Sequence, residues 1–502
     1  AGVHATWRNY DQMRPITELR FWRNSNGLKA IEVGHSQKHR LSIFGTPGIL
    51  QATFGYGGRT TGGPYNNSDL QRERRIWGRL RYQREDWAFE VSDLSSRHRI
   101  GTHSGVVPPE GAPFASIYVL PSCENCIVNP GRRNTFRNDL TARVRGPLLP
   151  GVASPTELSA TWTSNTFDFE VGGGSGVGGA SSPDTTWTVK LHGGHGRVQQ
   201  PLQAGRHHLT LGLRGSLWDV DRTNVPQVGG TRWSAHATAR DSFRLAGTNL
   251  VLDAGWHATS DQQYPSAAVQ LDRPLGPFRL SASASATGQR TAWFETDGFV
   301  DFVRPLDNAP STTAGQVLRG RVGLQYGLGA VDLTVEGFGH QIRNALDLYA
   351  MAPPEDQRVA STDTVAARRT ATPVRRVGAT ASLGWRREAS RGLYATGHAT
   401  ALTTLNADAS SLHTRLARTL PTIYAQGRIG ARFVFFVDLV TDFYVEARGW
   451  TGMNSRWFHP PTGRLVVPPA QNPVPSRPGF VPGPNGTIDV HAEIKLRGAT
   501  LF

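Results

Sequence analysis

Arginine is the side chain whose type and spacing carry the clearest chemical information in this sequence. The chain has 54 Lys and Arg residues against 39 Asp and Glu, which gives a formal net charge of +15. Lysine occurs only at Lys29, Lys38, Lys190 and Lys495. A guanidinium group binds phosphate or carboxylate through two parallel hydrogen bonds. The arginines therefore predict contacts with anions or with carboxylates of neighbouring segments.

The candidate arginines share one kind of position, because each stands in the polar row of a segment whose alternate residues are apolar or small. In one such segment, Ile76 and Leu80 alternate with arginines. The full set of candidates is Arg75, Arg79, Arg81, Arg143, Arg145, Arg319, Arg321, Arg428 and Arg448. If these rows face the lumen of a barrel, the lumen is cationic and favours small anionic solutes. Two other interpretations stay open: salt-bridge ladders between strands, and a general use of arginine as the surface charge.

Residue patterns typical of catalysis or metal binding are weak. The nucleophile element Gly-x-Ser-x-Gly is absent in a strand-to-helix context, and the glycine-rich stretch 172–179 is not followed by Lys-Ser/Thr. The spacing of His192 and His195 favours solvated histidines over a metal site. We therefore expect no enzyme activity, no cofactor and no metal ion, with a Ser/His pair assembled by folding as the open alternative.

The two cysteines form the motif Cys123-Glu-Asn-Cys126. A haem attachment would need His at the next position, where Ile127 stands, and a zinc site would need two further ligands nearby. We expect a small disulfide in an exposed loop, in an oxidising compartment. Two unreacted thiols are the alternative.

The last segment, 487–502, shows which elements must position the polar side chains. Apolar residues at even positions alternate there with charged and polar residues, namely Asp489, His491, Glu493, Lys495 and Arg497. Alternation of this kind indicates a strand whose two faces meet different environments. No apolar stretch approaches the roughly 20 residues of a membrane-spanning helix. The pattern therefore favours strands that cross a membrane in a barrel, where only alternate residues face lipid.

Short turns and long connections alternate along the chain. This rhythm predicts an all-β, antiparallel transmembrane barrel of about 20–22 strands, with short periplasmic turns and long extracellular loops. We expect one barrel over residues 1–502, with early strands in 1–40 and long extracellular loops at 98–136, 291–316, 344–374 and 454–486. A secreted, soluble all-β binding or carbohydrate-active protein is the alternative.

Residues 15–37 and 74–91, the long loops on one side and the aromatic Phe502 resemble the barrel part of TonB-dependent outer-membrane receptors. The resemblance covers most of the chain and implies location in the bacterial outer membrane. The plug domain of that family is not seen, and neither is a signal peptide. Segment 486–502 also resembles a family strand that comes shortly before the true end. A truncated chain is therefore an open alternative.

The expected function is uptake or passage of a solute through a receptor-like or porin-like barrel. The alternative is a scaffold barrel whose long loops bind another cell-envelope or surface protein. Expected partners are outer-membrane lipids, lipopolysaccharide and a small anionic solute. Nucleic acid is not expected, because the arginines are spread over strands and loops and do not gather on one helix or tail.

Overall fold

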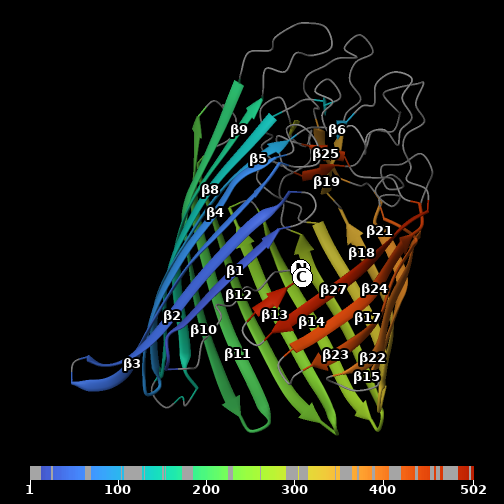
Figure 1. Cartoon of the computed structure of the whole chain (residues 1–502). Coiled ribbons are helices and arrows are strands. Elements are labelled where there is room, and N and C mark those ends of the chain that lie inside the picture. Colours follow the sequence, from blue (N-terminus) through green and yellow to red (C-terminus); the bar gives the residue numbers. More distant parts are fainter. Residues whose placement is uncertain are drawn as a thin grey trace, which may run out of the picture.

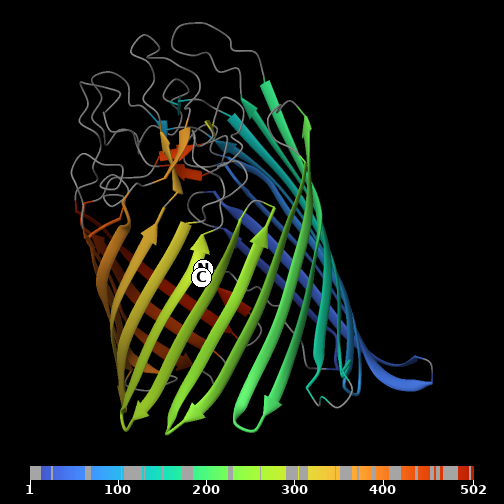
Figure 2. The same cartoon turned by 180° about the vertical axis from the view of Figure 1, so that it is seen from behind.

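One antiparallel sheet of 21 strands curves into the wall of a barrel (Figures 1 and 2). The computed structural model describes residues 13–23, 27–43, 45–62, 69–102, 105–106, 127–128, 131–149, 152, 154–171, 185–223, 230–260, 262–289, 303–304, 315–344, 346–350, 365–369, 372–386, 391–405, 420–435, 439–452, 457–459, 464–466, 484–496 and 499–501. Cys123, Cys126 and Phe502 lie outside these residues.

Neighbouring wall strands pair in chain order, and β1 and β28 are the two edges of this ladder in the described residues. They are β1 (Ile16–Arg23), β2 (Lys29–Ile43), β3 (Thr46–Thr61), β4 (Leu70–Arg84), β5 (Trp87–Thr102), β8 (Gly131–Gly146), β9 (Thr156–Val171), β10 (Thr185–Ala204), β11 (His207–Thr223), β12 (Gly230–Leu245), β13 (Thr248–Thr259), β14 (Gln263–Leu275), β15 (Phe278–Gln289), β17 (Gly315–Leu328), β18 (Val331–Arg343), β21 (Val374–Arg386), β22 (Gly392–Leu405), β23 (Ile423–Phe435), β24 (Leu439–Trp450), β27 (Asn485–Leu496) and β28 (Ala499–Leu501).

Short turns close one end of the wall, and the long connections leave the other end (Figure 1). Ala246 and Gly247 make the turn between β12 and β13 with φ of 48° and 79°, the left-handed conformations that suit a two-residue hairpin turn. Short strands within the long connections form three small sheets: β6 (Gly105–Val106) with β7 (Ile127–Val128), β16 (Val303–Arg304) with β20 (Val365–Arg369) and β19 (Leu346–Ala350), and β25 (Trp457–His459) with β26 (Arg464–Val466). The predicted fold class, strand number and alternation of turns are confirmed.

The strand bounds also locate the connections. β5 ends at Thr102 and β8 begins at Gly131, so this connection is shorter than the 98–136 loop expected from sequence. The starts of β17, β21 and β27 fall within two residues of the ends expected for the other three long loops. β1 and β2 lie largely in the 1–40 segment, where early strands were expected. In the described part of the chain, no helix has the length and apolar character needed for a membrane crossing.

Many apolar side chains of the sheet are exposed, and several polar ones are buried. Ile76, Leu80 and Leu213 are 57%, 56% and 56% exposed, whereas Arg79 and Glu446 are only 4% and 1% exposed. A water-soluble sheet has the opposite distribution, because burial of apolar side chains stabilises it. The arrangement fits a wall whose outer row contacts hydrocarbon. We call the row with the exposed apolar side chains the outer row, and the opposite row the polar row.

This polarity reverses near the loop end of β9, β10 and β11. Along the outer row of β11, exposed leucines end at Leu217 and are followed by Asp219 and Asp221. On the polar row of the same strands, polar residues give way to Phe169, Val189 and Val220, which are 2%, 3% and 6% exposed. The loop ends of these strands therefore have the polarity of a water-soluble protein, and the apolar band stops below them.

Exposed tryptophans mark this limit of the apolar band. Trp162, Trp233 and Trp256 are 56%, 44% and 49% exposed on β9, β12 and β13. Trp162 is opposite Gly194, Gly194 is opposite Leu217, and Leu217 is opposite Trp233. The two tryptophans therefore lie on one line that crosses neighbouring strands. Barrels place such aromatic side chains where lipid meets water. The apolar band and its aromatic border therefore define the level of the bilayer on this side.

Replacement of Gly55 by valine should destabilise the wall, because a β-carbon there would lie 2.2 Å from the Trp77 ring on the neighbouring strand. Displacement of a packed ring costs about 1–3 kcal/mol. Gly78→Val is the matched control, since a β-carbon on Gly78 meets no atom within 4 Å. Urea unfolding followed by tryptophan fluorescence measures both variants. Equal unfolding midpoints would contradict close packing of Trp77 on Gly55.

Candidate functional site

The candidate arginines all lie on the polar row. Alternation in β4 places Arg75, Arg79 and Arg81 opposite the exposed Ile76 and Leu80. The other candidates, on β8, β17, β23 and β24, likewise alternate with exposed apolar residues and comprise Arg143, Arg145, Arg319, Arg321, Arg428 and Arg448. The structure therefore places them on one continuous surface, divided into clusters that differ in how their charge is balanced.

The first cluster is a ladder of alternating charge across β4, β5, β8 and β9. Arg79 Nη1 lies 3.9 Å from Glu90 Oε2, and Arg143 Nη1 lies 3.9 Å from Glu90 Oε1. Arg143 Nε is in turn 3.6 Å from Glu157 Oε1. The Arg79 side chain is 2% exposed, so it depends on nearby negative charge, because a buried unpaired cation is costly. This cluster fits the salt-bridge interpretation of the sequence.

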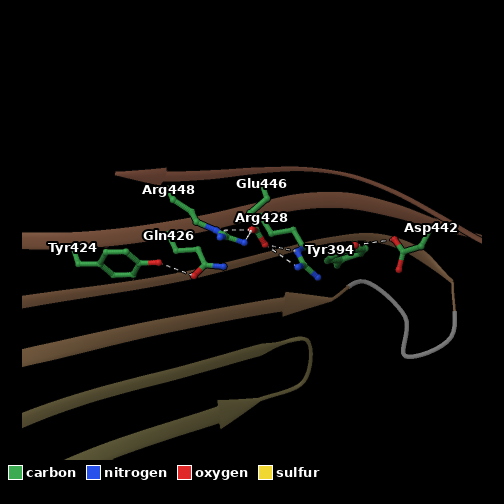
Figure 3. A network of polar contacts seen from close by, with 7 residues as sticks. All are labelled: Tyr394, Tyr424, Gln426, Arg428, Asp442, Glu446 and Arg448. Carbon is green, nitrogen blue, oxygen red and sulfur yellow. Dashed lines mark hydrogen bonds and ion pairs between the residues drawn. The ribbon is translucent and has the colours of Figure 1, made fainter. Parts of the chain in front are cut away.

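The second cluster is centred on Glu446 of β24 (Figure 3). Arg428 donates to Glu446 Oε2 from Nη2 at 2.8 Å, and Arg448 donates to Oε1 from Nε at 2.7 Å. The Glu446 side chain is 2% exposed, and the two arginine side chains are 38% and 46% exposed. One carboxylate thus orients two guanidinium groups, and Asp489 of β27 lies opposite Glu446 in the register, so two carboxylates stand beside the two arginines.

Neighbouring side chains extend this second cluster. Asp442 accepts from Tyr394 Oη at 2.7 Å and from Arg432 Nη2 at 2.6 Å. The Arg428 guanidinium lies 4.1 Å above the centre of the Tyr444 ring, a cation–π contact. The sequence analysis did not select Asp442, Tyr394 or Arg432. Arg432 could have been found, because it follows Arg428 on the same row of β23.

The remaining candidates divide into paired and unpaired arginines. Arg75 pairs with Glu73, and Arg321 Nε lies 3.1 Å from Glu336 Oε1. Within the described part of the chain, Arg81, Arg145 and Arg319 have no carboxylate in ion-pair range. Salt-bridge ladders therefore account for part of the arginine set and leave part without an acidic partner.

A line of register across the wall joins polar-row residues from β4 to β14. In strand order it contains Arg81, Glu90, Arg143, Ser159, Arg197, Arg214, His236, His257 and Tyr264. We call this line the basic row. Arg197 and Arg214 face each other directly in it. Like charges opposite each other destabilise a sheet, and Arg197 donates a hydrogen bond to Gln199 Oε1 on its own strand.

A recess of about 400 Å³ indents the wall beside the second cluster, lined among others by Asp332, Ser382, His398, Arg428 and Glu446. Ser382 Oγ lies 2.9 Å from His398 Nδ1, and Thr400 Oγ1 lies 3.3 Å from His398 Nε2. A serine nucleophile needs a histidine whose second nitrogen is held by an acidic group. Both ring nitrogens of His398 contact hydroxyl groups in the described residues, so this Ser/His pair lacks that arrangement.

Metal-binding geometry is also absent from the described residues. No three His, Cys, Asp or Glu side chains among them stand close enough to hold an ion. The rings of His236 and His257 have centroids 5.3 Å apart, but His257 stacks on Tyr264 at an interplanar angle of 5°. Stacked rings do not direct their ring nitrogens to a common point. The basic row therefore offers charge and stacking surfaces, and its geometry does not favour a metal centre.

Glu446→Gln should lower the stability of the barrel more than Glu336→Gln. Glutamine keeps the shape of Glu446 but leaves Arg428 and Arg448 without their common anion, whereas Glu336 contacts an arginine side chain that is 60% exposed. Exposed pairs contribute little, because water screens them. The temperature at which the folded band is lost on a heated gel measures both variants, and an equal shift would contradict the central role of Glu446.

No known family model matches the sequence, and no match was found among curated proteins. Solved structures do resemble the chain. The FrpB iron transporter from Neisseria meningitidis (F5-1 variant) has a TM-score of 0.66 at 12% identity, over 97% of this chain and 75% of that one. The siderophore receptor PirA from Pseudomonas aeruginosa has a TM-score of 0.61 at 12% identity, over 89% and 76% of the two chains.

A mutant of the ferric enterobactin receptor PfeA from Pseudomonas aeruginosa also resembles it, with a TM-score of 0.61 at 12% identity, over 96% of this chain and 72% of that one. These identities are low, so the likeness concerns the fold. It confirms the predicted fold: the described part of the chain forms a β-barrel similar to the barrels of these outer-membrane receptors.

Proposed function

We propose that this chain is a bacterial outer-membrane barrel that takes up or passes an anionic solute, in the manner of a receptor or porin. Its fold and the apolar outer row support location in a membrane, since exposed leucines and isoleucines would be unfavourable in water. The polar row then faces an aqueous lumen. The same placement brings outer-membrane lipids and lipopolysaccharide into contact with the outer row.

The observation that carries the solute class is the basic row. It brings Arg81, Arg143, Arg197 and Arg214 into one line with a single carboxylate, that of Glu90. Arg143 is balanced by Glu90 and Glu157. Within the described residues, no carboxylate lies in ion-pair range of Arg81, Arg197 or Arg214. A lumen with this excess of positive charge attracts anions and repels cations.

Iron(III) chelates are the solute class that fits this wall best. The similar structures are named as an iron transporter, a siderophore receptor and a ferric enterobactin receptor. Carboxylate or catecholate groups around iron(III) give a chelate a net negative charge. Arginine pairs and His236 would hold the oxygen atoms of such a chelate through charge-assisted hydrogen bonds. The solute is cargo, and no enzyme chemistry is proposed.

A scaffold function is the second candidate, and the small sheets of the long connections favour it. β19 pairs with β20, β20 pairs with β16, and β25 pairs with β26, all at the loop end of the barrel (Figure 1). Loops with their own sheet structure can present a defined surface to another cell-envelope or surface protein. In that case the lumen would carry no solute, and the basic row would serve stability alone.

The location is tested by cell fractionation. We expect the protein in the outer-membrane fraction and a heat-dependent shift on a gel, because a barrel with a continuous hydrogen-bonded ladder resists detergent until it is heated. Neither cysteine belongs to a wall strand, so reducing agent should leave the shift unchanged. If the protein stayed soluble without detergent, membrane location would be contradicted and the soluble all-β alternative would be favoured.

Arg197→Gln/Arg214→Gln should weaken binding of an iron(III)–citrate chelate at least about tenfold, because two charge-assisted contacts are lost. Arg240→Gln/Arg279→Gln is the matched control: it removes the same charge from arginines that already pair with Asp253 and Asp272. Tryptophan quenching in detergent gives the dissociation constants, and uptake into proteoliposomes gives the transport rate.

The control should retain binding within about threefold, since its arginines are already engaged with carboxylates. If both double variants lost the same affinity for the chelate, the net charge of the protein would determine binding, and a specific site on the basic row would be ruled out. No binding by the unmodified protein, together with co-purification of an envelope protein at fixed stoichiometry, would instead favour the scaffold function.

A further inference from the structure

A cluster of arginines lies on the outer row, at the loop end of β4, β5 and β8. Arg74 of β4 and Arg97 of β5 are both exposed. Arg99 follows Arg97 on the same row, and Arg132 of β8 lies one step further toward the loops. These arginines belong to the face that contacts lipid lower down, and they take no part in the basic row. We call them the outer arginine cluster.

The level of this cluster relative to the bilayer follows from the apolar band. On β4 the exposed apolar residues Leu80 and Ile76 lead directly to Arg74 along the outer row. On β8 they are Leu140 and Phe136, 47% and 39% exposed, and the row then continues to Asn134 and Arg132. The outer arginine cluster therefore stands just above the hydrocarbon, at the level of lipid head groups.

Figure 1 supports this placement, since β5, β8 and β9 rise toward the loop end beyond the strands of the C-terminal half. β8 and β9 have 16 residues each, whereas β21, β23 and β24 have 13, 13 and 12. The extra length carries charged residues on the outer row of β9 to β11 as well, namely Asp168, Glu170, Lys190, Asp219 and Asp221. The tall side of the wall thus projects from the membrane with a charged outer face.

The charges of the cluster are not balanced internally. Arg74 and Arg97 face each other directly in the β4–β5 register, an arrangement that destabilises a sheet. Glu170 on the same face accepts from Arg99 Nη2 at 3.4 Å and from Asn134 Nδ2 at 3.0 Å, and it lies opposite Arg132 in the register. Within the described residues, no carboxylate lies in ion-pair range of Arg74 or Arg97. The pair has the charge to hold a dianion.

We propose that Arg74 and Arg97, flanked by Arg99 and Arg132, bind the phosphate of an outer-leaflet glycolipid head group. Opposed side chains on adjacent strands start about 4.5–5.5 Å apart, so two guanidinium forks can hold one phosphate from both sides. The acyl chains of the same lipid would lie along Ile76, Leu80 and Leu140. The proposal rests on the outer-membrane placement and is independent of the solute in the lumen.

The test compares two lipids that differ only in phosphate. The full chain is reconstituted in phosphatidylcholine vesicles that contain either bis-phosphorylated or dephosphorylated lipid A, and bound lipid is counted by native mass spectrometry after release into mild detergent. We expect the unmodified protein to retain the phosphorylated lipid at least about tenfold more strongly. Arg74→Gln/Arg97→Gln should reduce this preference to below about twofold.

Arg81→Gln/Arg145→Gln is the matched control, because it removes two arginines from the polar row of β4 and β8, and neither has a carboxylate of the described residues in ion-pair range. It should keep the full preference. A heat-shifted band for each variant shows that the barrel has folded. Preference retained in the Arg74/Arg97 variant, or lost equally in the control, would overturn the proposal. Inorganic pyrophosphate that displaces the lipid at equal concentration would also overturn it, since the site would then serve a soluble anion.

Failure of this proposal can be told apart from failure of the outer-membrane placement. If the protein does not enter vesicles and gives no heat-shifted band, the membrane placement itself is wrong, and the head-group site falls with it. If the protein inserts and shifts but shows no preference for the phosphorylated lipid, the placement stands and only the head-group site is rejected.

Discussion

The structure depends on one constraint: within hydrocarbon, every backbone N–H and C=O group must be paired inside the protein. The antiparallel ladder from β1 to β28 meets this constraint between neighbouring wall strands, and β1 and β28 are its two edges in the described residues. Once the ladder is formed, side chains can only alternate between two faces. The exposed leucines, the arginine clusters and the tryptophan border are all consequences of that alternation.

The polar row must then resolve its own charges, and it does so unevenly. Glu446 holds two arginines and Glu90 stands between two more, so carboxylates neutralise part of the positive charge and fix the geometry of the rest. Arg197 and Arg214 oppose each other instead. Stability alone would favour a balanced wall. The local excess of positive charge at this pair is therefore the feature on which the proposed anionic solute depends.

The two halves of the wall meet the membrane differently. In the C-terminal half, the outer row is apolar along β21 and β23, whose alternate residues run from Val377 to Leu383 and from Ile423 to Phe435. In the N-terminal half, longer strands leave the apolar band and reverse their polarity, with Phe169 and Val189 buried behind a charged outer face. A tall, charged side beside a short, apolar side gives the barrel an asymmetric contact with its surroundings.

The sequence alone determined the all-β fold, the approximate strand number and the order of turns and loops, because period-two alternation and turn residues are local properties. It also placed Arg79, Arg143 and Arg428 on one row. Only the tertiary structure decided which of them are neutralised, because the register between neighbouring strands sets Arg143 between Glu90 and Glu157 and sets Arg428 against Glu446. The opposed pairs Arg197–Arg214 and Arg74–Arg97 have the same origin: hairpin register follows from the conformation of the turn and the pairing of both strands, and the alternation along one strand does not encode it.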